Sequence, residues 1–548
     1  EMCIRDSIQT ICALLLVILL LAALRVPVGT FMYKTFTDKK HNPVEKVIYK
    51  LIGVNPDNEM RWTSYAIASI AFGVFSVLVL WVIIMAQGML PWAFGRSQDW
   101  HTALNTAVSF TTNTNWQSYS GETGASYVVG MAGLTVQNFV SAATGIAVAI
   151  ALFRGLARTG SGTVGNFWVD LVRASIRILL PISIVGAFLL MVGGVVQNLA
   201  DPIHTTTITG SDQTILTGPV ASEEAIKMLG TNGGGIFNAN SAHPFENPNA
   251  FTNLLEILLV LLIPFSLPVT YGLFVKDRRQ GRALTAAMLI LWAVSAALLV
   301  WAESARPLTA LEGKETRFGV LWSAIFATTT TGTSTGAVNS MHDSYSPLGG
   351  GLVMFNMMLG EVSPGGVGTG MYNMLTFVVL SVFIAGLMIG RTPEVLGKTI
   401  GRREITLAAL SAIVMPALVL LLTGIAVLIP GVRESMNNTG PHGLSEVLYA
   451  YTSGANNNGS AFAGLSAGTP YLNLTIAFAM FVGRFAPIAL MVALAGAFAS
   501  QRRREDNSGA MPTHNVTFTV LLLCVILIVA GLTFLPSLAL GPIAEALS

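Results

Sequence analysis

Four short polar segments constrain what this chain can fold into, because each of them lies between two long apolar stretches. They are rich in Gly, Asn, Ser and Thr and occupy residues 111–116, 230–235, 331–336 and 453–459. Non-helical backbone at membrane depth is tolerated only where it is buried in protein or lines a water-filled cavity, since lipid offers no hydrogen-bond partners. The four segments therefore predict one cavity or pore that is lined from four places in the chain.

The composition identifies the chain as an integral membrane protein. Of its 548 residues, 53% are hydrophobic and only 11% are charged, whereas soluble domains carry about 25% charged residues. A membrane-spanning helix needs about 20 mostly apolar residues. We therefore predict an all-α polytopic membrane protein whose ten or so transmembrane helices lie at residues 8–28, 64–87, 128–153, 172–197, 252–275, 283–303, 352–390, 405–430, 470–499 and 515–540.

Charge and cysteine content argue against several other classes. The formal net charge is +2 and no basic tail is present, so nothing indicates a nucleic-acid partner. Cys3, Cys12 and Cys524 cannot supply a disulfide framework or a zinc site. Arg25 and further basic residues follow the first apolar run, and no small-residue cleavage site does, which favours a retained helix over a signal peptide.

The distribution of basic residues sets the expected orientation. Most of the 30 Lys and Arg residues lie in five segments, at residues 25–61, 154–177, 276–282, 391–403 and 502–504. Cytoplasmic loops carry an excess of Lys and Arg, so these five segments are predicted to be cytoplasmic. The four polar segments then all face outward. With ten spans, both termini are expected on the outer side as well.

The order of apolar and polar segments indicates one unit repeated four times, namely a span, a half-length pore helix, a polar loop and a second span. The expected pore helices are residues 101–112, 223–231, 318–330 and 444–453. Such a chain forms a pseudo-fourfold pore with one extra helix at each end. The predicted divisions are an N-terminal helix and cytoplasmic loop at 8–62, pore repeats at 63–153, 171–275, 283–390 and 405–499, and a C-terminal helix at 515–542.

The polar loops align as four triplets, which we interpret as a selectivity filter for K⁺. The third position is Gly in three loops and Asn in the first, residue types that tolerate positive φ and can turn successive carbonyls toward one axis. The triplets contain no carboxylate, and neutral carbonyls can replace the hydration shell of K⁺. Ordinary turns share this composition, but four in equivalent places favour the filter. Its predicted residues are Asn113, Thr114, Asn115, Thr231, Asn232, Gly233, Ser334, Thr335, Gly336, Asn457, Asn458 and Gly459.

Other polar residues near the triplets receive secondary assignments. The hydroxyls of Thr114 and Thr335 offer further oxygen ligands, and Gln117 is assigned to the mouth of the filter. The nearest carboxylates could attract cations to the outer mouth, but we favour their interpretation as solvated loop charges. These carboxylates are Glu122, Glu246 and Asp343.

A cluster of helix-breaking residues interrupts the apolar run at 352–390. Pro364 and four glycines predict an unwound, movable segment in the third repeat, placed below the filter as a gate. Ionisable residues within spans usually face the interior and are paired, so we expect Glu361 to pair with Arg484. Arg391 either adds electrostatic blockade or anchors its span at the membrane surface. The residues assigned to the gate are Glu361, Gly365, Gly366, Gly368, Gly370, Arg391 and Arg484.

Several longer motifs resemble one known family. Residues 113–122, 230–247, 386–394, 455–462 and 481–485 are similar to segments of KdpA, the potassium-binding A subunit of the bacterial Kdp pump. The resemblance covers nearly the whole chain from Ile8 onward. The third filter departs from the family form in having Thr335 where a Cys can occur, and Thr keeps an oxygen available.

The resemblance implies a multi-pass subunit of a four-subunit assembly in the bacterial inner membrane. This subunit would bind extracellular K⁺ and deliver it through an intramembrane tunnel to a P-type ATPase catalytic subunit, with the gate residues blocking the straight path. A single-span accessory subunit and a small membrane peptide would complete the complex. The chain contains no Asp-Lys-Thr-Gly phosphorylation site. We therefore expect a non-catalytic subunit with K⁺ as the transported ion and no organic cofactor.

Two other functions stay open from the sequence. A stand-alone potassium channel or symporter would share the fourfold pore architecture and would differ in the path below the filter. A secondary transporter with inverted repeats and broken helices would have two related halves, whereas this chain shows four units facing one way. A membrane enzyme is disfavoured, because no nucleophile–base or metal constellation is apparent in the sequence.

Overall fold

Ten long apolar helices form the frame of the computed structural model, which describes residues 2–305, 311–504 and 511–548, with the backbone alone for residues 2–7. Within these ranges ten helices are long and apolar enough to cross a membrane, which confirms the predicted number. The spans are α1 (Met2–Thr37), α3 (Trp62–Met85), α6 (Val136–Ala157) with the π-helical turn Val129–Thr135 before it, α7 (Phe167–Arg173) joined to α8 (Leu180–Val192) by the π-helical turn Ala174–Leu179, α10 (Ala250–Phe274), α11 (Arg278–Ser304), α14 (Thr369–Ile389), α15 (Arg402–Ala426), α18 (Pro470–Ser500) and α19 (Val516–Leu538), which continues through Ala539–Ile543 into α20 (Ala544–Leu547).

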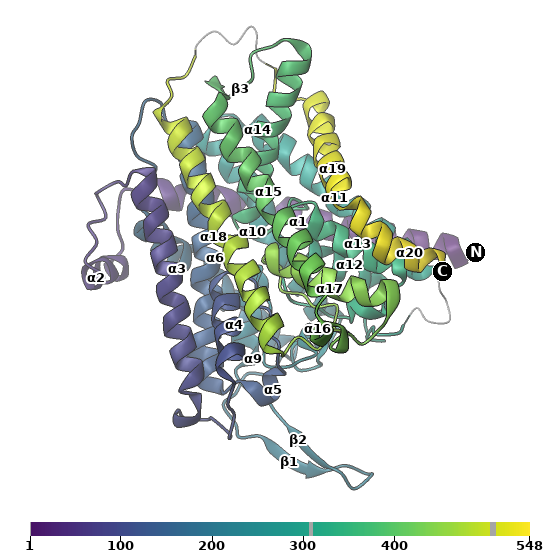
Figure 1. Cartoon of the computed structure of the whole chain (residues 1–548). Helices are drawn as coiled ribbons and strands as arrows, with labels where there is room; N and C mark the ends of the chain where they lie inside the picture. The colour runs from purple at the N-terminus through teal and green to yellow at the C-terminus, as the bar shows by residue number, and fades with distance from the viewer. Residues whose placement is uncertain (1, 306–310, 505–510) are drawn as a thin grey trace.

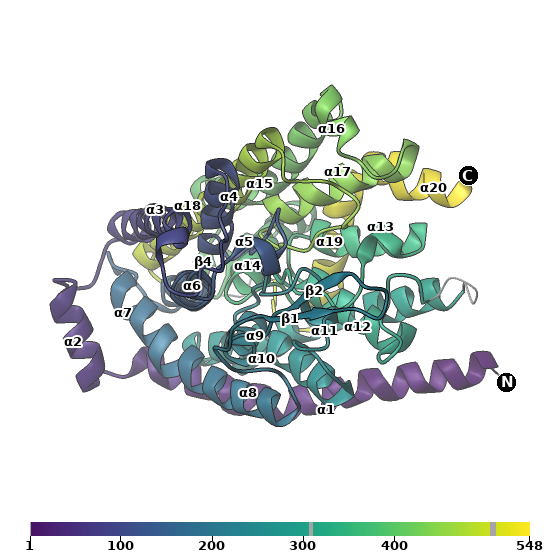
Figure 2. The same cartoon turned by 90° about the horizontal axis from the view of Figure 1, so that it is seen from below.

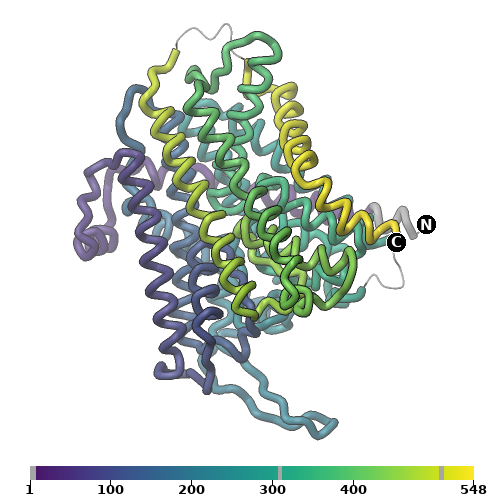
Figure 3. Tube along the Cα trace, in the orientation of Figure 1, coloured from purple at the N-terminus to yellow at the C-terminus, as the bar shows by residue number. Residues whose placement is uncertain are grey.

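The spans differ in how much of their surface meets other protein. Most of α6 and α10 is buried, whereas only a small part of α1 and α15 is, as expected of helices at the lipid-facing periphery. Seen from below, α1 runs along one edge beside α10, against which it packs (Figure 2). Figure 3 shows the yellow trace of α19 beside the green trace of α14, with which it is in contact.

Four shorter helices lie between pairs of spans, and each leads directly into one polar loop. They are α4 (Trp100–Thr111), α9 (Val220–Leu229), α12 (Gly319–Gly332) and α17 (Gly440–Ala455). Their positions match the four predicted pore helices to within a few residues. They are surrounded by protein, as the burial of every residue from Ser323 to Gly332 illustrates. A helix buried on all sides has no polar face, so its sequence is weakly patterned and length and position are the usable signals.

The apolar run at 352–390 is not one helix. It divides into α13 (Pro347–Met358) and α14, with the non-helical breaker segment 359–368 between them. Ser346 is the N-cap of α13, since its hydroxyl accepts a hydrogen bond from the amide of Gly349 at 3.0 Å. Gly368, with a φ of 87°, precedes the first residue of α14. The interruption predicted from the Pro and Gly cluster is therefore present in the structure.

Several small elements fall outside the all-α prediction. Two antiparallel hairpins are present, one of β1 (Ile203–Thr206) with β2 (Asp212–Ile215) and one of β3 (Glu394–Val395) with β4 (Lys398–Thr399). They project at opposite ends of the molecule in Figure 1. The remaining pieces are α2 (Pro43–Leu51), α5 (Gly121–Gly124), α16 (Pro430–Glu434) and single 3₁₀ turns at Gln87–Met89, Asn240–Ala242 and His342–Ser344.

The hairpin of β3 and β4 places the Lys398 ammonium between the ends of two spans. Its Nζ donates hydrogen bonds to the carbonyl oxygens of Gly155 at 2.7 Å and Phe498 at 2.6 Å, and also to that of Arg158. These carbonyls belong to the last turns of α6 and α18, where main-chain oxygens lack helical partners. A buried cation at this place stabilises both helix ends.

Replacing Lys398 by Met should destabilise the fold. The change keeps the apolar stem and leaves the carbonyls without their charged donor, which should cost roughly 2–3 kcal/mol of unfolding free energy. Thermal unfolding of the detergent-solubilised protein measures the effect. Lys39→Met, at an exposed position, is the matched control and should leave the unfolding temperature unchanged. Equal unfolding temperatures for the two variants would contradict this role of Lys398.

Candidate functional site

The four polar loops form a closed ring in which each loop contacts the next one along the chain and the fourth contacts the first. The first and second loops are joined by Asn113, whose Nδ2 donates to the carbonyl oxygen of Thr231 at 2.9 Å. The second and third are joined by the amide of Gly336, which donates to the carbonyl oxygen of Asn232 at 3.0 Å. Loops more than a hundred residues apart in the chain thus satisfy one another's main-chain groups.

The fourth loop closes the ring on both sides. Asn458 Nδ2 donates to the carbonyl oxygen of Thr333 in the third loop at 2.6 Å. Asn457 Nδ2 donates to the hydroxyl of Thr114 in the first loop at 2.9 Å. All nine non-glycine residues of the predicted filter are buried. The structure therefore brings together the twelve residues that the sequence placed in four triplets.

Glycines are needed in the ring because neighbouring main chains touch there. A Cβ at Gly336 would lie 2.9 Å from the carbonyl carbon of Gly459, and one at Gly233 would lie 2.7 Å from that of Gly336. Real Cβ atoms do not approach so closely, so a side chain at either position would force the loops apart. Gly459 also has a φ of 94°, which favours glycine.

The backbone conformation of the triplets differs from the expectation. Positive φ was expected at the third position, where only Asn115 and Gly459 adopt it. The first position adopts it in three loops instead, with φ of 65° at Asn113, 48° at Thr231 and 54° at Asn457. At the third position of the second and third loops, glycine is needed because neighbouring main chains touch there. The sequence alone does not show whether a glycine is present for positive φ or for close main-chain contact.

Each loop retains a main-chain carbonyl that accepts no hydrogen bond from any other described residue. Examples, one from each loop in order, are the carbonyls of Thr114, Gly233, Ser334 and Asn458. Buried carbonyls without a donor are costly, and a weakly hydrated cation is a suitable partner for such a set. The hydroxyls offered as further ligands have protein partners, since Thr114 Oγ1 lies 2.8 Å from Thr112 Oγ1 and Thr335 Oγ1 lies 2.7 Å from Thr333 Oγ1.

One end of the ring opens into a cavity of about 860 Å³. Each of the four loops contributes to its lining, through Asn115, Gly234, Gly336 and Gly459. Gln117 also lines it, and its Nε2 donates to the carbonyl oxygen of Gly235 at 3.3 Å. Gln117 therefore lies beside the ring at the end that opens into this cavity.

The opposite end of the ring is covered by the breaker segment. The amide of Gly365 donates to the carbonyl oxygen of Gly332 at 2.8 Å, and the amide of Val367 donates to Thr231 Oγ1 at 3.0 Å. Glu361 accepts a hydrogen bond from the hydroxyl of Ser334. The segment thus contacts the second and third loops directly.

The glycines of the breaker segment allow this close contact. Gly368 lies against the carbonyl of Gly145 in α6, so that any side chain there would overlap the helix backbone. Gly365 packs on Gly370 in the first turn of α14, and Gly366 packs on Ser334. The glycine cluster that the sequence marked as a helix breaker is therefore a packing surface between α6 and the ring.

Glu361 and Arg484 do not form the expected direct ion pair among the described residues, although the Arg484 charge acts on the Glu361 carboxylate from a distance. The closest hydrogen-bond partner of each is another residue. Arg484 Nη2 donates to the carbonyl oxygen of Ser141 in α6 at 2.8 Å, whereas Glu361 faces Ser334. Arg391 is exposed just beyond the end of α14, a position suited to a membrane-surface anchor.

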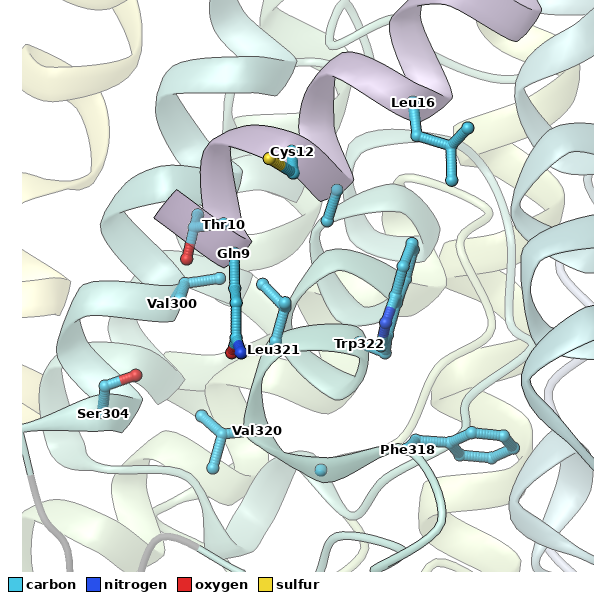
Figure 4. A pocket seen from close by; sticks show the side chains of 12 residues that line it. Gln9, Thr10, Cys12, Leu16, Val300, Ser304, Phe318, Val320, Leu321 and Trp322 are labelled. Atoms are coloured by element: carbon cyan, nitrogen blue, oxygen red, sulfur yellow. The ribbon is translucent and has the colours of Figure 1, made fainter. Parts of the chain in front are cut away.

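A small cavity of about 70 Å³ lies on the covered side of the ring. Glu361 and Asn457 line it together with residues of α14, α15, α18 and α19. It therefore borders the fourth loop, while the breaker segment contacts the second and third loops. A larger hollow of about 700 Å³ between α1, α11 and α12 (Figure 4) is lined by no residue of the ring, so it is a separate feature.

A buried ion network behind the second loop was not foreseen. Lys227 Nζ lies 2.6 Å from Glu224 and 2.8 Å from Glu246, and all three side chains are nearly inaccessible. Glu246 also accepts a hydrogen bond from the amide of Phe237 at 3.2 Å. Its interpretation as a solvated loop charge is therefore wrong. The spacing of Glu224 and Lys227, three positions apart on α9, is the signal that could have revealed the pair.

The other two carboxylates near the loops also have specific partners. Glu122 accepts a hydrogen bond from the amide of Asn238 at 2.9 Å, and this contact is exposed. Asp343 pairs with His442 at 2.8 Å and is only 11% exposed. Of the three, Glu122 comes nearest to a solvated loop charge.

Comparison with known proteins now identifies the family. The family model described as potassium-transporting ATPase A subunit, KdpA, matches residues 15–547. This chain belongs to the KdpA family. A potassium-transporting ATPase potassium-binding subunit from Kineococcus radiotolerans is 54% identical over 97% of each chain. One of the same description from Clavibacter michiganensis is 53% identical over 99% of this chain and all of its own.

The fold is also shared outside the family. The potassium transporter TrkH from Vibrio parahaemolyticus matches 88% of this chain and 97% of its own with a TM-score of 0.53. Sequence identity is 16%, so this likeness concerns the arrangement of helices alone. It shows that KdpA-family chains and TrkH share the same overall architecture.

Reversing the charges of Glu361 and Arg484 together should not restore a stable protein. Each reversal alone buries a charge that lacks an opposite charge beside it, which should cost roughly 3–5 kcal/mol. Because the two residues have different neighbours, the double variant Glu361→Arg with Arg484→Glu should unfold no later than the less stable single variant. Thermal unfolding of the four forms tests this, with Arg391→Glu as an exposed control. Recovery of the original unfolding temperature in the double variant would reinstate the pairing.

Proposed function

We propose that this chain is the potassium-binding and translocating subunit of a high-affinity, ATP-driven potassium uptake pump. The observation that carries the proposal is the closed ring of four buried loops, each with a main-chain carbonyl that has no donor among the described residues. The relatives from Kineococcus and Clavibacter, over nearly their full length, are described as potassium-binding subunits of a potassium-transporting ATPase. Ring and relatives point to the same cargo, K⁺.

In this proposal the ring is the selectivity filter and the cavity of about 860 Å³ is its outer mouth. K⁺ arrives from outside, passes Gln117 and exchanges its hydration shell for main-chain oxygens of the four triplets. Hydrogen bonds between the loops fix the spacing of these oxygens. Because a ring of fixed size can neither shrink around Na⁺ nor widen for a larger cation, it prefers K⁺ by ion size and by the number of oxygen ligands.

The breaker segment is proposed to act as the gate. It contacts the second and third loops, so an ion leaving the ring in their direction meets Glu361 and the closely packed glycines Gly365, Gly366, Gly368 and Gly370. The small cavity beside Asn457 lies toward α14, α15 and α19. Its position supports a sideways route through an intramembrane tunnel, with Arg484 nearby on α18.

The proposed partners follow from this role. A P-type ATPase catalytic subunit hydrolyses ATP and receives K⁺ from the tunnel, and this chain contributes no catalysis of its own. A single-span accessory subunit and a small membrane peptide complete the assembly in the bacterial inner membrane. Both termini of this chain are placed on the outer side, in accordance with the distribution of basic residues.

Replacing Gly336 or Gly233 by Ala should weaken discrimination between K⁺ and other alkali cations. The added methyl group separates neighbouring loops and changes the spacing of their carbonyls. We expect the preference for K⁺ over Na⁺ and Rb⁺ to fall by about tenfold or more, which is about 1.4 kcal/mol of relative affinity. The measurement is ATPase stimulation of the purified complex by each cation. Gly424→Ala is the control, because nothing lies within 4 Å of a Cβ there, and unchanged ion preference in the ring variants would refute the filter.

Reconstitution tests the division of labour between this chain and its ATPase partner. Potassium-stimulated ATP hydrolysis should appear when the complex contains this chain and disappear when it is left out. Liposomes containing the chain alone should show no K⁺ flux, because the breaker segment closes the direct path. Steady K⁺ conduction by the chain alone would instead favour a self-sufficient channel or symporter.

A further inference from the structure

Three potential metal ligands meet beside the outer cavity. Asp343 lies in the 3₁₀ turn that follows the third loop, and His442 and Glu446 lie on α17. His442 and Glu446 are four positions apart and so share one face of the helix. One ligand atom from each of the three side chains lies within 4.8 Å of the others. A single ion can therefore reach all three.

The imidazole of His442 is oriented as in many metal sites. Its Nε2 lies 2.8 Å from Asp343 Oδ1, and its Nδ1 lies 2.9 Å from Glu545 Oε1 in α20. Metal-binding histidines usually give the second ring N–H to a carboxylate, which fixes the tautomer and the ring plane. Glu545 holds that place here and leaves Nε2 directed at the other two ligands.

The Glu446 carboxylate is held in position before any ion binds. It is fully buried and accepts hydrogen bonds from the amides of Asn437 at 2.9 Å and Asn438 at 3.0 Å. These donors hold the carboxylate toward Asp343 and His442. Asp343 and His442 are 11% and 18% exposed, so an ion from the outer solution has access to the cluster.

Gly464 leaves room beside both carboxylates. A Cβ at this position would lie 2.6 Å from Glu446 Oε1 and 2.9 Å from Asp343 Oδ1. Any other residue would fill the space next to the two oxygens. The glycine therefore keeps a small cradle free of side chains between the oxygen ligands.

We propose that Asp343, His442 and Glu446 form a site for a divalent transition-metal ion of the Zn²⁺ or Mn²⁺ type. Two carboxylates and one imidazole match the preferences of these ions, and a solvent-accessible fourth position leaves room for water. The bound ion joins the segment after the third loop to the fourth pore helix, and through Glu545 to α20. Met341 and Ala463, close in sequence to Asp343 and Gly464, line the outer cavity, so the ion braces one wall of that cavity.

Metal titration of the purified complex tests the proposal. Mn²⁺, followed by electron paramagnetic resonance in saturating K⁺, should bind at one ion per chain, show coupling to a ¹⁴N nucleus, and be displaced by Zn²⁺. Saturating K⁺ keeps this measurement separate from the ring. Absence of stoichiometric binding of both ions, the result expected if His442 merely forms ion pairs with its carboxylates, would overturn the proposal.

Variants locate the binding. His442→Gln and Asp343→Asn should weaken Mn²⁺ binding by roughly a hundredfold, and Glu545→Gln by about tenfold because it removes only the orienting carboxylate. Gly464→Ala should also weaken binding, although it removes none of the ligands, because its Cβ would press on the Glu446 and Asp343 carboxylates. Asp201→Asn, at an exposed position, is the control and should bind as the original protein does.

Two readouts separate metal binding from folding and from transport. Thermal unfolding without metal reports whether a variant is folded. If a ligand variant is unfolded, Gly464→Ala still tests whether the ion binds at this site. Unchanged Mn²⁺ affinity in both His442→Gln and Gly464→Ala would place the ion elsewhere and refute the site. Failure of potassium-stimulated ATP hydrolysis would count against the proposed pump function and would leave the metal result unaffected.

Discussion

The ring depends on one constraint, which is that main-chain polar groups at membrane depth must find partners within the protein. The loops meet it largely by bonding to one another, with Asn113, Asn457 and Asn458 reaching across to the neighbouring loop. An amide side chain is well suited to this task because it donates without introducing charge. The polar residues that look out of place in an apolar chain are thus the ones that make a non-helical structure possible there.

The surroundings of the ring are far less symmetric than the ring itself. In the described part of the chain, the apolar run after the third loop is divided into α13 and α14, and the residues between these helices contact two of the four loops. The buried Lys227 with two carboxylates supports the second loop, whereas the buried Lys314 beside the large cavity pairs with the carboxylate of Glu303. The four loops therefore share one ring, and local features of the surrounding helices differentiate one side of the ring from another.

Sequence reasoning succeeded where the signal was local and failed where it was not. Span number, pore-helix positions and the break at Pro364 follow from hydropathy, length and Pro or Gly content within short windows. The partners of Glu361, Arg484 and Glu246 depend on which distant segments lie side by side, and spacing along the chain does not contain that information. The role of each ring glycine was ambiguous for the same reason, since close approach and positive φ select the same residue.

The bonds between α6 and α18 have a consequence for how the molecule can move. Arg484 joins the two helices through the carbonyl of Ser141, and Lys398 joins their ends through Gly155 and Phe498. Linked at two levels, these helices hold the segments that follow the first and fourth loops in a fixed relation. The breaker segment packs against this pair without a side chain between the main chains, since a Cβ at Gly368 would overlap the carbonyl of Gly145.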